Sequence, residues 1–152
     1  MAHGHSALAT AHIGLNVTDL KRSVAFYQQV FGFDILRRSE SEGRRFAFLG
    51  SGKTLVVTLW QQSDGKFEKR RSGLHHLSFQ VSSVEELKQA EARIRASGGK
   101  LVHDGLVAHA EGADSGGLFF EDPDGIRLEI YAPAGLAGYA APTSDGPTCG
   151  FF

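Results

Sequence analysis

Two histidines and one glutamate lie in short alternating stretches where they could bind a metal ion. His12 begins a stretch of alternating polar and apolar residues, and His76 begins a matching stretch 64 residues later. Glu129 stands between two apolar residues of a third stretch, where burying a carboxylate without a partner is costly. Two interpretations of Glu129 are open. It lies on an exposed strand face and pairs with a lysine or arginine, or it is a metal ligand that needs two others.

The three side chains fall on equivalent faces of their predicted strands. Side chains alternate between the two faces of a strand, so His12, His76 and Glu129 point away from the apolar face. Two imidazoles and one carboxylate in one cleft are the ligand set of non-heme Fe(II) sites, and they also suit Mn, Ni or Zn. A single histidine on a strand is more often a hydrogen-bonded core residue. The coincidence of all three favours a divalent metal site, with Fe(II) as the preferred metal.

A repeated unit must position these residues. Residues 12–60 predict a strand, a helix over residues 20–31 and three further strands. Residues 74–133 predict the same order, with residues 103–116 as a loop. In each unit the apolar strand faces pack against the helix, which leaves an opposite, partly polar face. The fold class is therefore α+β, with two paired βαβββ units that form a curved mixed sheet around a metal-binding cleft.

Local signals predict the ends of the helices and the last hairpin. Thr18–Asp19 is a helix N-cap signal, and Gly32 is a C-cap signal for the same helix. Ser83 and Glu86 have the spacing of a capping box at the start of the second helix. The segment Asp122–Gly125 combines proline and glycine between two apolar runs, which predicts a β-turn.

Three further segments complete the predicted domain organisation. Residues 1–11, which include His3 and His5, are expected to be a flexible N-terminal arm. Residues 12–133 form a single domain, in which the polar residues 61–73 link the two units. Residues 134–152 form a C-terminal tail that is either disordered or a flap over a cleft or partner, since it ends in two phenylalanines.

The bulk composition excludes several classes of protein. The chain of 152 residues has 41% hydrophobic residues, 22% charged residues and a formal net charge of −1. This balance argues against nucleic acid or an anionic membrane as the main partner. No apolar run approaches the length of a bilayer span, and no hydrophobic signal region begins the chain, so a cytoplasmic location is expected. The single cysteine, Cys149, excludes an internal disulfide framework.

The same alternation predicts which residues line the cleft. We expect the substrate to contact eight of them: Asn16, Phe48, Thr58, Trp60, Ser78, Gln80, Phe119 and Arg127. The aromatic members favour a flat or apolar small-molecule substrate. Tyr131 is the best candidate for a general acid, although a packing role is the alternative. Arg127 either holds an anionic group of the substrate or forms a surface ion pair.

These motifs resemble the vicinal oxygen chelate superfamily of glyoxalases, bleomycin-binding proteins and extradiol dioxygenases. The resemblance covers about residues 12–133, and it lies in four segments: His12–Leu20, Ser23–Phe33, Gly73–Phe79 and Phe120–Glu129. It implies paired βαβββ units and a metal held by His12, His76 and Glu129. The fourth ligand of glyoxalase I would fall at Thr58, so the three-ligand pattern is more similar to that of dioxygenases and fosfomycin-type transferases.

The resemblance implies a metal-dependent enzyme whose substrate chelates the metal through oxygen atoms. Extradiol-dioxygenase-like chemistry is preferred to glyoxalase or lyase, isomerase or transferase chemistry. The alternative is a resistance protein that sequesters an antibiotic or another small molecule without chemistry. Many members of this family pair, and paired sheets leave strand edges to be covered, so a homodimer is expected.

Overall fold

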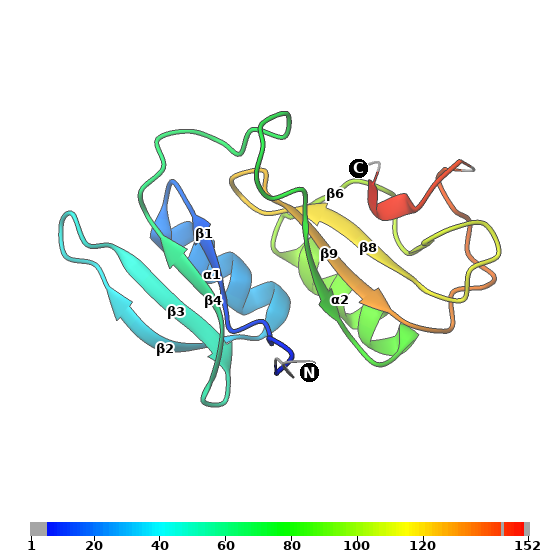
Figure 1. Cartoon of the computed structure of the whole chain (residues 1–152), viewed down its shortest axis with the longest axis horizontal. Coiled ribbons are helices and arrows are strands. Elements are labelled where there is room, and N and C mark those ends of the chain that lie inside the picture. Colours follow the sequence, from blue (N-terminus) through cyan, green and yellow to red (C-terminus); the bar gives the residue numbers. More distant parts are fainter. Residues whose placement is uncertain (1–5, 144, 151–152) are drawn as a thin grey trace, which may run out of the picture.

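Two units lie side by side in the computed structural model, which describes residues 6–143 and 145–150 (Figure 1). Unit one contains β1 (Ile13–Asn16), α1 (Leu20–Phe31), β2 (Asp34–Ser39), β3 (Phe46–Ser51) and β4 (Thr54–Trp60). Its sheet has the order β1-β4-β3-β2, in which only β1 and β4 are parallel. This is the βαβββ order predicted from the sequence.

Unit two repeats this order with one addition. It contains β5 (Leu77–Gln80), α2 (Val84–Ala96), β6 (Lys100–Leu101), β7 (Val107–Ala108), β8 (Gly116–Glu121) and β9 (Arg127–Ala132). Its sheet has the order β5-β9-β8-β6, and β7 also pairs with β8. The added strand β7 lies inside the segment that was predicted to be a loop, and its two residues are too few to show alternation.

The capping residues define both helices as the sequence predicts. Asp19 accepts a hydrogen bond from the backbone N–H of Arg22 (3.0 Å), and Ser83 accepts one from Glu86 (3.3 Å). Gly32 ends α1 with a φ of 70°, a left-handed conformation that glycine adopts without strain. These contacts fix where each helix begins and where α1 ends.

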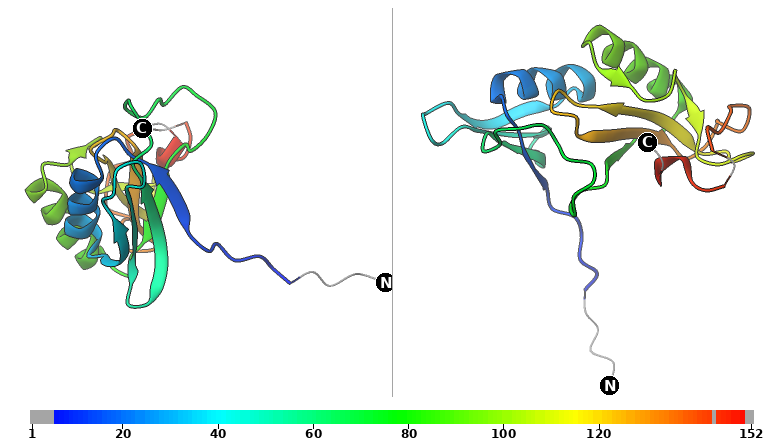
Figure 2. Two further views of the ribbon diagram at one scale, coloured as in Figure 1. Left: turned by 90° about the vertical axis from the view of Figure 1, so that its left-hand side faces the viewer. Right: turned by 90° about the horizontal axis from the view of Figure 1, so that it is seen from above.

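Both helices lie on the same side of the two sheets (Figure 2), and α1 contacts α2. The core fills the space between the helices and the sheets. Ala47 and Leu49 on β3, and Leu128 and Ile130 on β9, face this core and are at most 3% exposed. The alternate residues of the same strands therefore occupy the opposite faces, where the sequence places the site.

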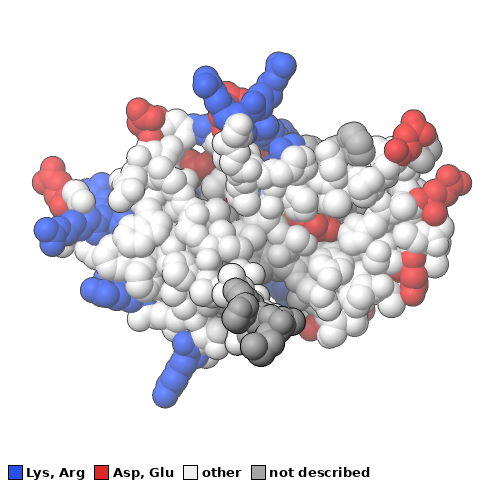
Figure 3. All heavy atoms as spheres, in the orientation of Figure 1, with Lys and Arg blue, Asp and Glu red and all other residues white. Residues whose placement is uncertain are grey.

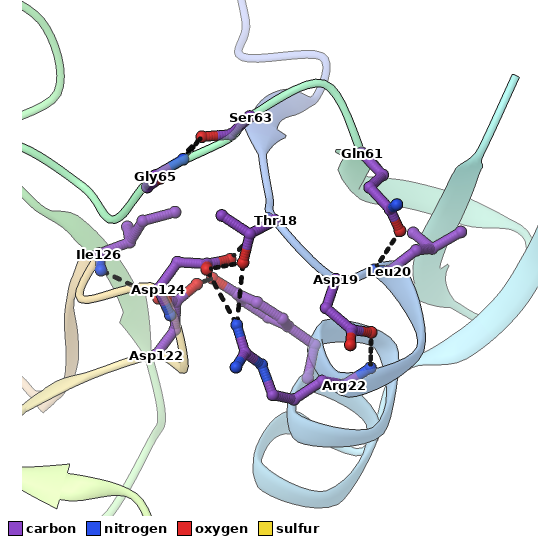
Figure 4. A network of polar contacts seen from close by, with 11 residues as sticks. Thr18, Asp19, Leu20, Arg22, Gln61, Ser63, Gly65, Asp122, Asp124 and Ile126 are labelled. Carbon is purple, nitrogen blue, oxygen red and sulfur yellow. Dashed lines mark hydrogen bonds and ion pairs between the residues drawn. The ribbon is translucent and has the colours of Figure 1, made fainter. Parts of the chain in front are cut away.

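A polar clasp joins the units on the side of the β8–β9 turn (Figure 4). Asp124 accepts hydrogen bonds from the backbone N–H (3.1 Å) and hydroxyl of Thr18, and from Arg22 (3.1 Å). Asp122 accepts one from the phenol of Tyr27 (3.0 Å). Because Asp122 and Asp124 are almost fully buried, these bonds fix the turn of unit two against α1 of unit one. We call these five residues the inter-unit clasp.

Each sheet ends in a strand that has a hydrogen-bonded neighbour on one side only. Two of these edge strands are β1 in unit one and β5 in unit two, and the opposite edges are β2 and β6. An unpaired edge presents free backbone groups that can pair with another chain. Within the described residues, the single chain thus leaves two sheet edges open beside the residues predicted to bind metal.

Among the described segments outside the two units, only the C-terminal one contains regular structure. Residues 61–73 contain no helix or strand, and residues 6–11 are exposed without regular structure. His3 and His5 lie outside the described residues, as do the two terminal phenylalanines. Residues 134–143 and 145–150 return to unit two and include the 3-10 helix η1 (Thr148–Gly150), so this part of the predicted tail is folded against the domain.

Charge is divided unequally between the units. Residues 12–60 carry seven Lys or Arg and four Asp or Glu, whereas residues 74–133 carry five and ten. On the face shown in Figure 3, basic side chains gather over the unit-one end and the linker, and the unit-two end carries mainly acidic ones. In the described part of the chain, no helix has the length and apolar character needed to cross a bilayer.

Candidate metal centre

The Glu129 carboxylate lies buried between two histidine rings. Its Oε1 atom is 2.6 Å from Nε2 of His109, and its Oε2 atom is 3.5 Å from Nε2 of His76. Only 3% of Glu129 is exposed. The interpretation of Glu129 as part of an exposed strand face is therefore wrong. These two contacts are with histidines and not with the lysine or arginine of that interpretation.

His109 follows β7, and each of its polar groups has a partner. Its backbone N–H donates to the carbonyl of Ser115 (3.0 Å), and its carbonyl accepts the N–H of Thr148 (2.8 Å). Its Nδ1 atom is 2.9 Å from the hydroxyl of Ser115. Because a carboxylate only accepts, Nε2 of His109 carries hydrogen and donates to Glu129, and Nδ1 forms a hydrogen bond with the Ser115 hydroxyl, which can donate or accept. Contacts at both ring nitrogens thus fix the orientation of the imidazole.

His75, the preceding residue in the chain, orients the ring of His76. The Nδ1 atoms of His75 and His76 are 2.8 Å apart, and Nε of Arg127 donates to the carbonyl of His75 (2.9 Å). Arg127 is 8% exposed, so it is not the surface residue of the alternative interpretation. Burial lowers the pKa of His76, although the charge of Glu129 opposes this shift. The lowered pKa favours the neutral form of His76, which is the form that binds metals.

Other predicted cleft residues of unit two surround Glu129. Ser78 on β5 and Phe119 on β8 are its partners in the strand register. Tyr131 donates a hydrogen bond to Gln80 (2.6 Å), and its ring centroid is 5.5 Å from that of His109. Tyr131 therefore lies beside His109, the hydrogen-bond donor to Glu129.

The predicted residues of unit one lie on the other sheet. Phe48 and Trp60 are half-buried, with ring centroids 5.9 Å apart, and Trp60 donates to the hydroxyl of Thr58 (2.9 Å). The side chain of Asn16 accepts the backbone N–H of Gln62 (2.9 Å), so it fixes the chain after β4. His12 is exposed and directly precedes β1.

His76 and Glu129 fit a divalent ion, but His12 does not lie with them. Ligand atoms at right angles on an ion with bonds of about 2.1 Å are about 3 Å apart. The 3.5 Å between His76 Nε2 and Glu129 Oε2 is close to that spacing, and His75 supplies the outer hydrogen bond typical of a ligating histidine. Among the described residues, no three His, Cys, Asp or Glu side chains are grouped as a metal site would require. One chain therefore brings together two of the three predicted ligands.

His109 was not among the site residues predicted from the sequence. This residue lies in the segment interpreted as a loop, and strand alternation does not apply there. The available signal was the short apolar run Val107–Ala108 before it, which forms β7 and pairs with Gly116 and Gly117. The tight packing of β7 on β8 turns His109 toward Glu129.

The comparisons with known proteins agree with this architecture. Residues 9–130 match the family described as the glyoxalase/bleomycin resistance protein/dioxygenase superfamily. The chain is 31% identical over 126 residues to a catechol-2,3-dioxygenase of Bacillus subtilis; the match covers 80% of this chain and 41% of that protein. It is 32% identical over 124 residues to a lactoylglutathione lyase of Salmonella typhimurium, covering 78% and 88% of the two chains.

A solved structure shares the fold at lower identity. A mutant of the fosfomycin resistance protein FosX from Listeria monocytogenes, in complex with Mn(II) and 1S,2S-dihydroxypropylphosphonic acid, has a TM-score of 0.63 and 23% identity. The match covers 86% of this chain and 94% of that one. The chain belongs to the glyoxalase/bleomycin resistance protein/dioxygenase superfamily. Its relatives include a dioxygenase and a lyase, and a metal-bound structure is among its structural neighbours.

Proposed function

We propose that this protein is a divalent-metal-dependent enzyme with dioxygenase-like chemistry on a small aromatic substrate that has adjacent oxygen atoms. The observation that carries the proposal is the buried carboxylate of Glu129, held between Nε2 of His76 and Nε2 of His109. A buried carboxylate beside a neutral histidine is costly unless a cation or hydrogen bonds compensate its charge. The hydrogen bond from His109 supplies part of that compensation, and a metal ion bound by His76 and Glu129 would supply the rest.

The proposed metal is Fe(II), with Mn, Ni or Zn as alternatives. A bound divalent ion would supply Lewis acidity toward two substrate oxygens and, as iron, redox chemistry with dioxygen. His76 and Glu129 would bind it. His109 holds a hydrogen at Nε2 against Glu129, which keeps the carboxylate oriented. Tyr131 carries a hydrogen at its phenol oxygen and donates it to Gln80 in the free protein. It could instead transfer this hydrogen to a substrate oxygen.

Unit one would supply the surface for the aromatic ring. The half-buried rings of Phe46, Phe48 and Trp60 contact one another, with centroid separations of 5.2 to 5.9 Å. They lie on the face of the sheet opposite to the core, as does the Thr58 hydroxyl that accepts the Trp60 N–H. Such a surface favours a flat apolar group.

We propose that the active form is a homodimer in which His12 of one copy completes the site on unit two of the other. Two features support this arrangement. The edge strands β1 and β5 each lack a neighbour on one side in the described chain. A two-fold axis can pair β1 of each copy with β5 of the other. The excess of basic residues in unit one and of acidic residues in unit two makes such cross-pairing electrostatically favourable.

A mixing experiment tests both the ligands and the dimer. His12→Ala and Glu129→Ala variants are expected to bind no stoichiometric Mn(II) when each is alone. When the two are mixed and allowed to exchange subunits, half of the dimers are mixed, and each mixed dimer has one intact site. Mn(II) binding should then return to about a quarter of the wild-type sites.

The outcomes separate the alternatives. No recovery on mixing, with a monomer in light scattering, would show that the site is not shared between chains. Full metal binding by both single variants would exclude the ligands themselves. The sequestration function predicts that an aromatic ligand such as catechol binds metal-free and metal-loaded protein equally well, because an apolar surface needs no metal.

A further inference from the structure

The segment after β9 returns to unit two and packs along β7. The backbone N–H of Ala108 donates to the carbonyl of Ala140 (3.0 Å), so β7 has β8 on one side and this segment on the other. The hydroxyl of Thr148 donates to the carbonyl of Ala108 (2.7 Å), with the carbonyl of His109 also 3.0 Å away. Thr148 is completely buried. We call residues 134–143 and 145–150 the C-terminal strap.

Two further contacts hold the strap at its beginning. The N–H groups of Gly135 and Leu136 donate to the side chain (2.9 Å) and carbonyl (2.7 Å) of Asp114. Leu136 is fully buried against Gly116, where an added Cβ atom would lie 2.8 Å from its side chain. The strap therefore holds both ends of the loop that runs from His109 to Gly116.

We propose that the strap is part of the metal centre and that Thr148 is a positioning residue for His109. The argument follows the chain of contacts. Thr148 holds the backbone carbonyls of Ala108 and His109. The ring of His109 is held by Ser115 and donates to Glu129. If the strap moves, the backbone of His109 loses its anchor, and the hydrogen bond that orients Glu129 weakens.

The proposal rests on the proposed function only for the role of Glu129 as a metal ligand. The contacts themselves can be tested without metal. The Nε2 hydrogen of His109 reports the bond to Glu129, because its exchange with solvent is slow only while that bond is intact. Cys149 is the single cysteine of the chain and follows Thr148 directly, so the rate at which its thiol reacts with a disulfide reagent reports the seating of the strap.

The experiment compares Thr148→Val with two controls in metal-free protein labelled with ¹⁵N-histidine. Thr148→Val keeps the side-chain shape and the backbone N–H but removes the hydroxyl. Thr148→Ser keeps the hydroxyl. Thr143→Val removes a hydroxyl of the same strap that donates to the carbonyl of Gly146 (3.0 Å). His109→Gln identifies the resonance of the His109 Nε2 hydrogen by its disappearance.

The expected result is that Thr148→Val speeds exchange of the His109 Nε2 hydrogen on the order of tenfold and accelerates the reaction of Cys149. Thr148→Ser and Thr143→Val should match the wild type in the exchange of this hydrogen. Unchanged exchange in Thr148→Val, whether or not Cys149 reacts faster, would overturn the proposal, as would equal acceleration by Thr143→Val. If Thr148→Val does not fold by circular dichroism, Thr148→Ala under the same comparison replaces it.

The Mn(II) affinity distinguishes this proposal from the proposed function. If Thr148 controls exchange of the His109 hydrogen and Thr148→Val also binds Mn(II) at least several-fold more weakly, the strap is confirmed as a part of the metal centre. If exchange responds but wild-type protein binds no divalent metal, the proposed function is wrong while the positioning of His109 by Thr148 stands.

Discussion

The phenol of Tyr27 on α1 donates a 3.0 Å hydrogen bond to the carboxylate of Asp122 in the β8–β9 turn. Both side chains are buried, and they come from different units. Burial raises the pKa of Asp122 to about 6, although hydrogen bonds from Ile126, Tyr27 and Asp124 act in the opposite direction. The inter-unit clasp therefore contains a group that titrates just below neutral pH.

The first prediction concerns this carboxyl group. Because the folded protein binds the Asp122 proton more tightly than the unfolded chain, its contribution to stability is complete below about pH 4 and is lost as pH rises through 6. The difference amounts to about 3 kcal/mol. Asp122→Asn should remove this part of the pH dependence between pH 4 and 7. Urea denaturation across this range measures it, and parallel pH profiles for the two proteins would contradict the assignment.

The second prediction concerns Gly117 on β8. A Cβ atom at this position would lie 2.2 Å from the carbonyl oxygen of Ile130 and 2.9 Å from Cα of Tyr131. The clash is with backbone, which cannot move without disturbing the pairing of β8 and β9. Gly117→Ala should therefore lower the free energy of unfolding by about 1–3 kcal/mol or more. Gly138→Ala is the matched control, since a Cβ atom added there would have no atom within 4 Å, and equal stability of the two variants would refute the clash.

The third prediction concerns His109. His109→Ala removes the donor to Glu129, and loss of such an outer contact typically costs about 10–100-fold in metal affinity. His109→Gln retains an N–H donor and should stay within a few-fold of the wild type. Calorimetric titration with Mn(II) measures both. Equal affinities of the alanine variant and the wild type would show that Glu129 does not depend on His109.

The fourth prediction concerns a substrate-like ligand. A catechol that chelates the ion through two oxygens binds in a deprotonated form, so binding releases protons and its affinity should rise with pH. Titration of catechol into Fe(II)-loaded protein without oxygen, from pH 6 to 9, tests this. Metal-free protein should bind much more weakly at every pH. Metal-dependent binding without turnover when oxygen is admitted would keep the site and exclude dioxygenase chemistry for this ligand.

Much of the fold could be predicted because its signals are local. Asp19, Gly32 and Ser83 act within one helical turn, and alternation along β9 separates Leu128 from Glu129 without reference to the rest of the chain. The position of Glu129 on the strand face opposite to the core follows from that pattern. Its burial does not, because the residues that cover it come from other segments.

The remainder of the site depends on contacts between distant segments. His109 faces Glu129 because a two-residue strand pairs with glycines of β8 and because Thr148 holds its carbonyl from 39 residues away. No periodic pattern encodes either contact. The separation of His12 from His76 and Glu129 likewise depends on how the two units pack, which alternation within each strand does not determine.

The two units are joined by direct side-chain contacts as well as by the linker. Residues 61–73 form no helix or strand. Thr18, Arg22 and Tyr27 precede this segment, and they donate hydrogen bonds to Asp122 and Asp124, which follow it. A protease that cuts within the linker would therefore leave the two halves associated. The covalent connection also keeps the halves at high local concentration, and Phe67 of the linker adds a backbone hydrogen bond to Asp124 (2.8 Å).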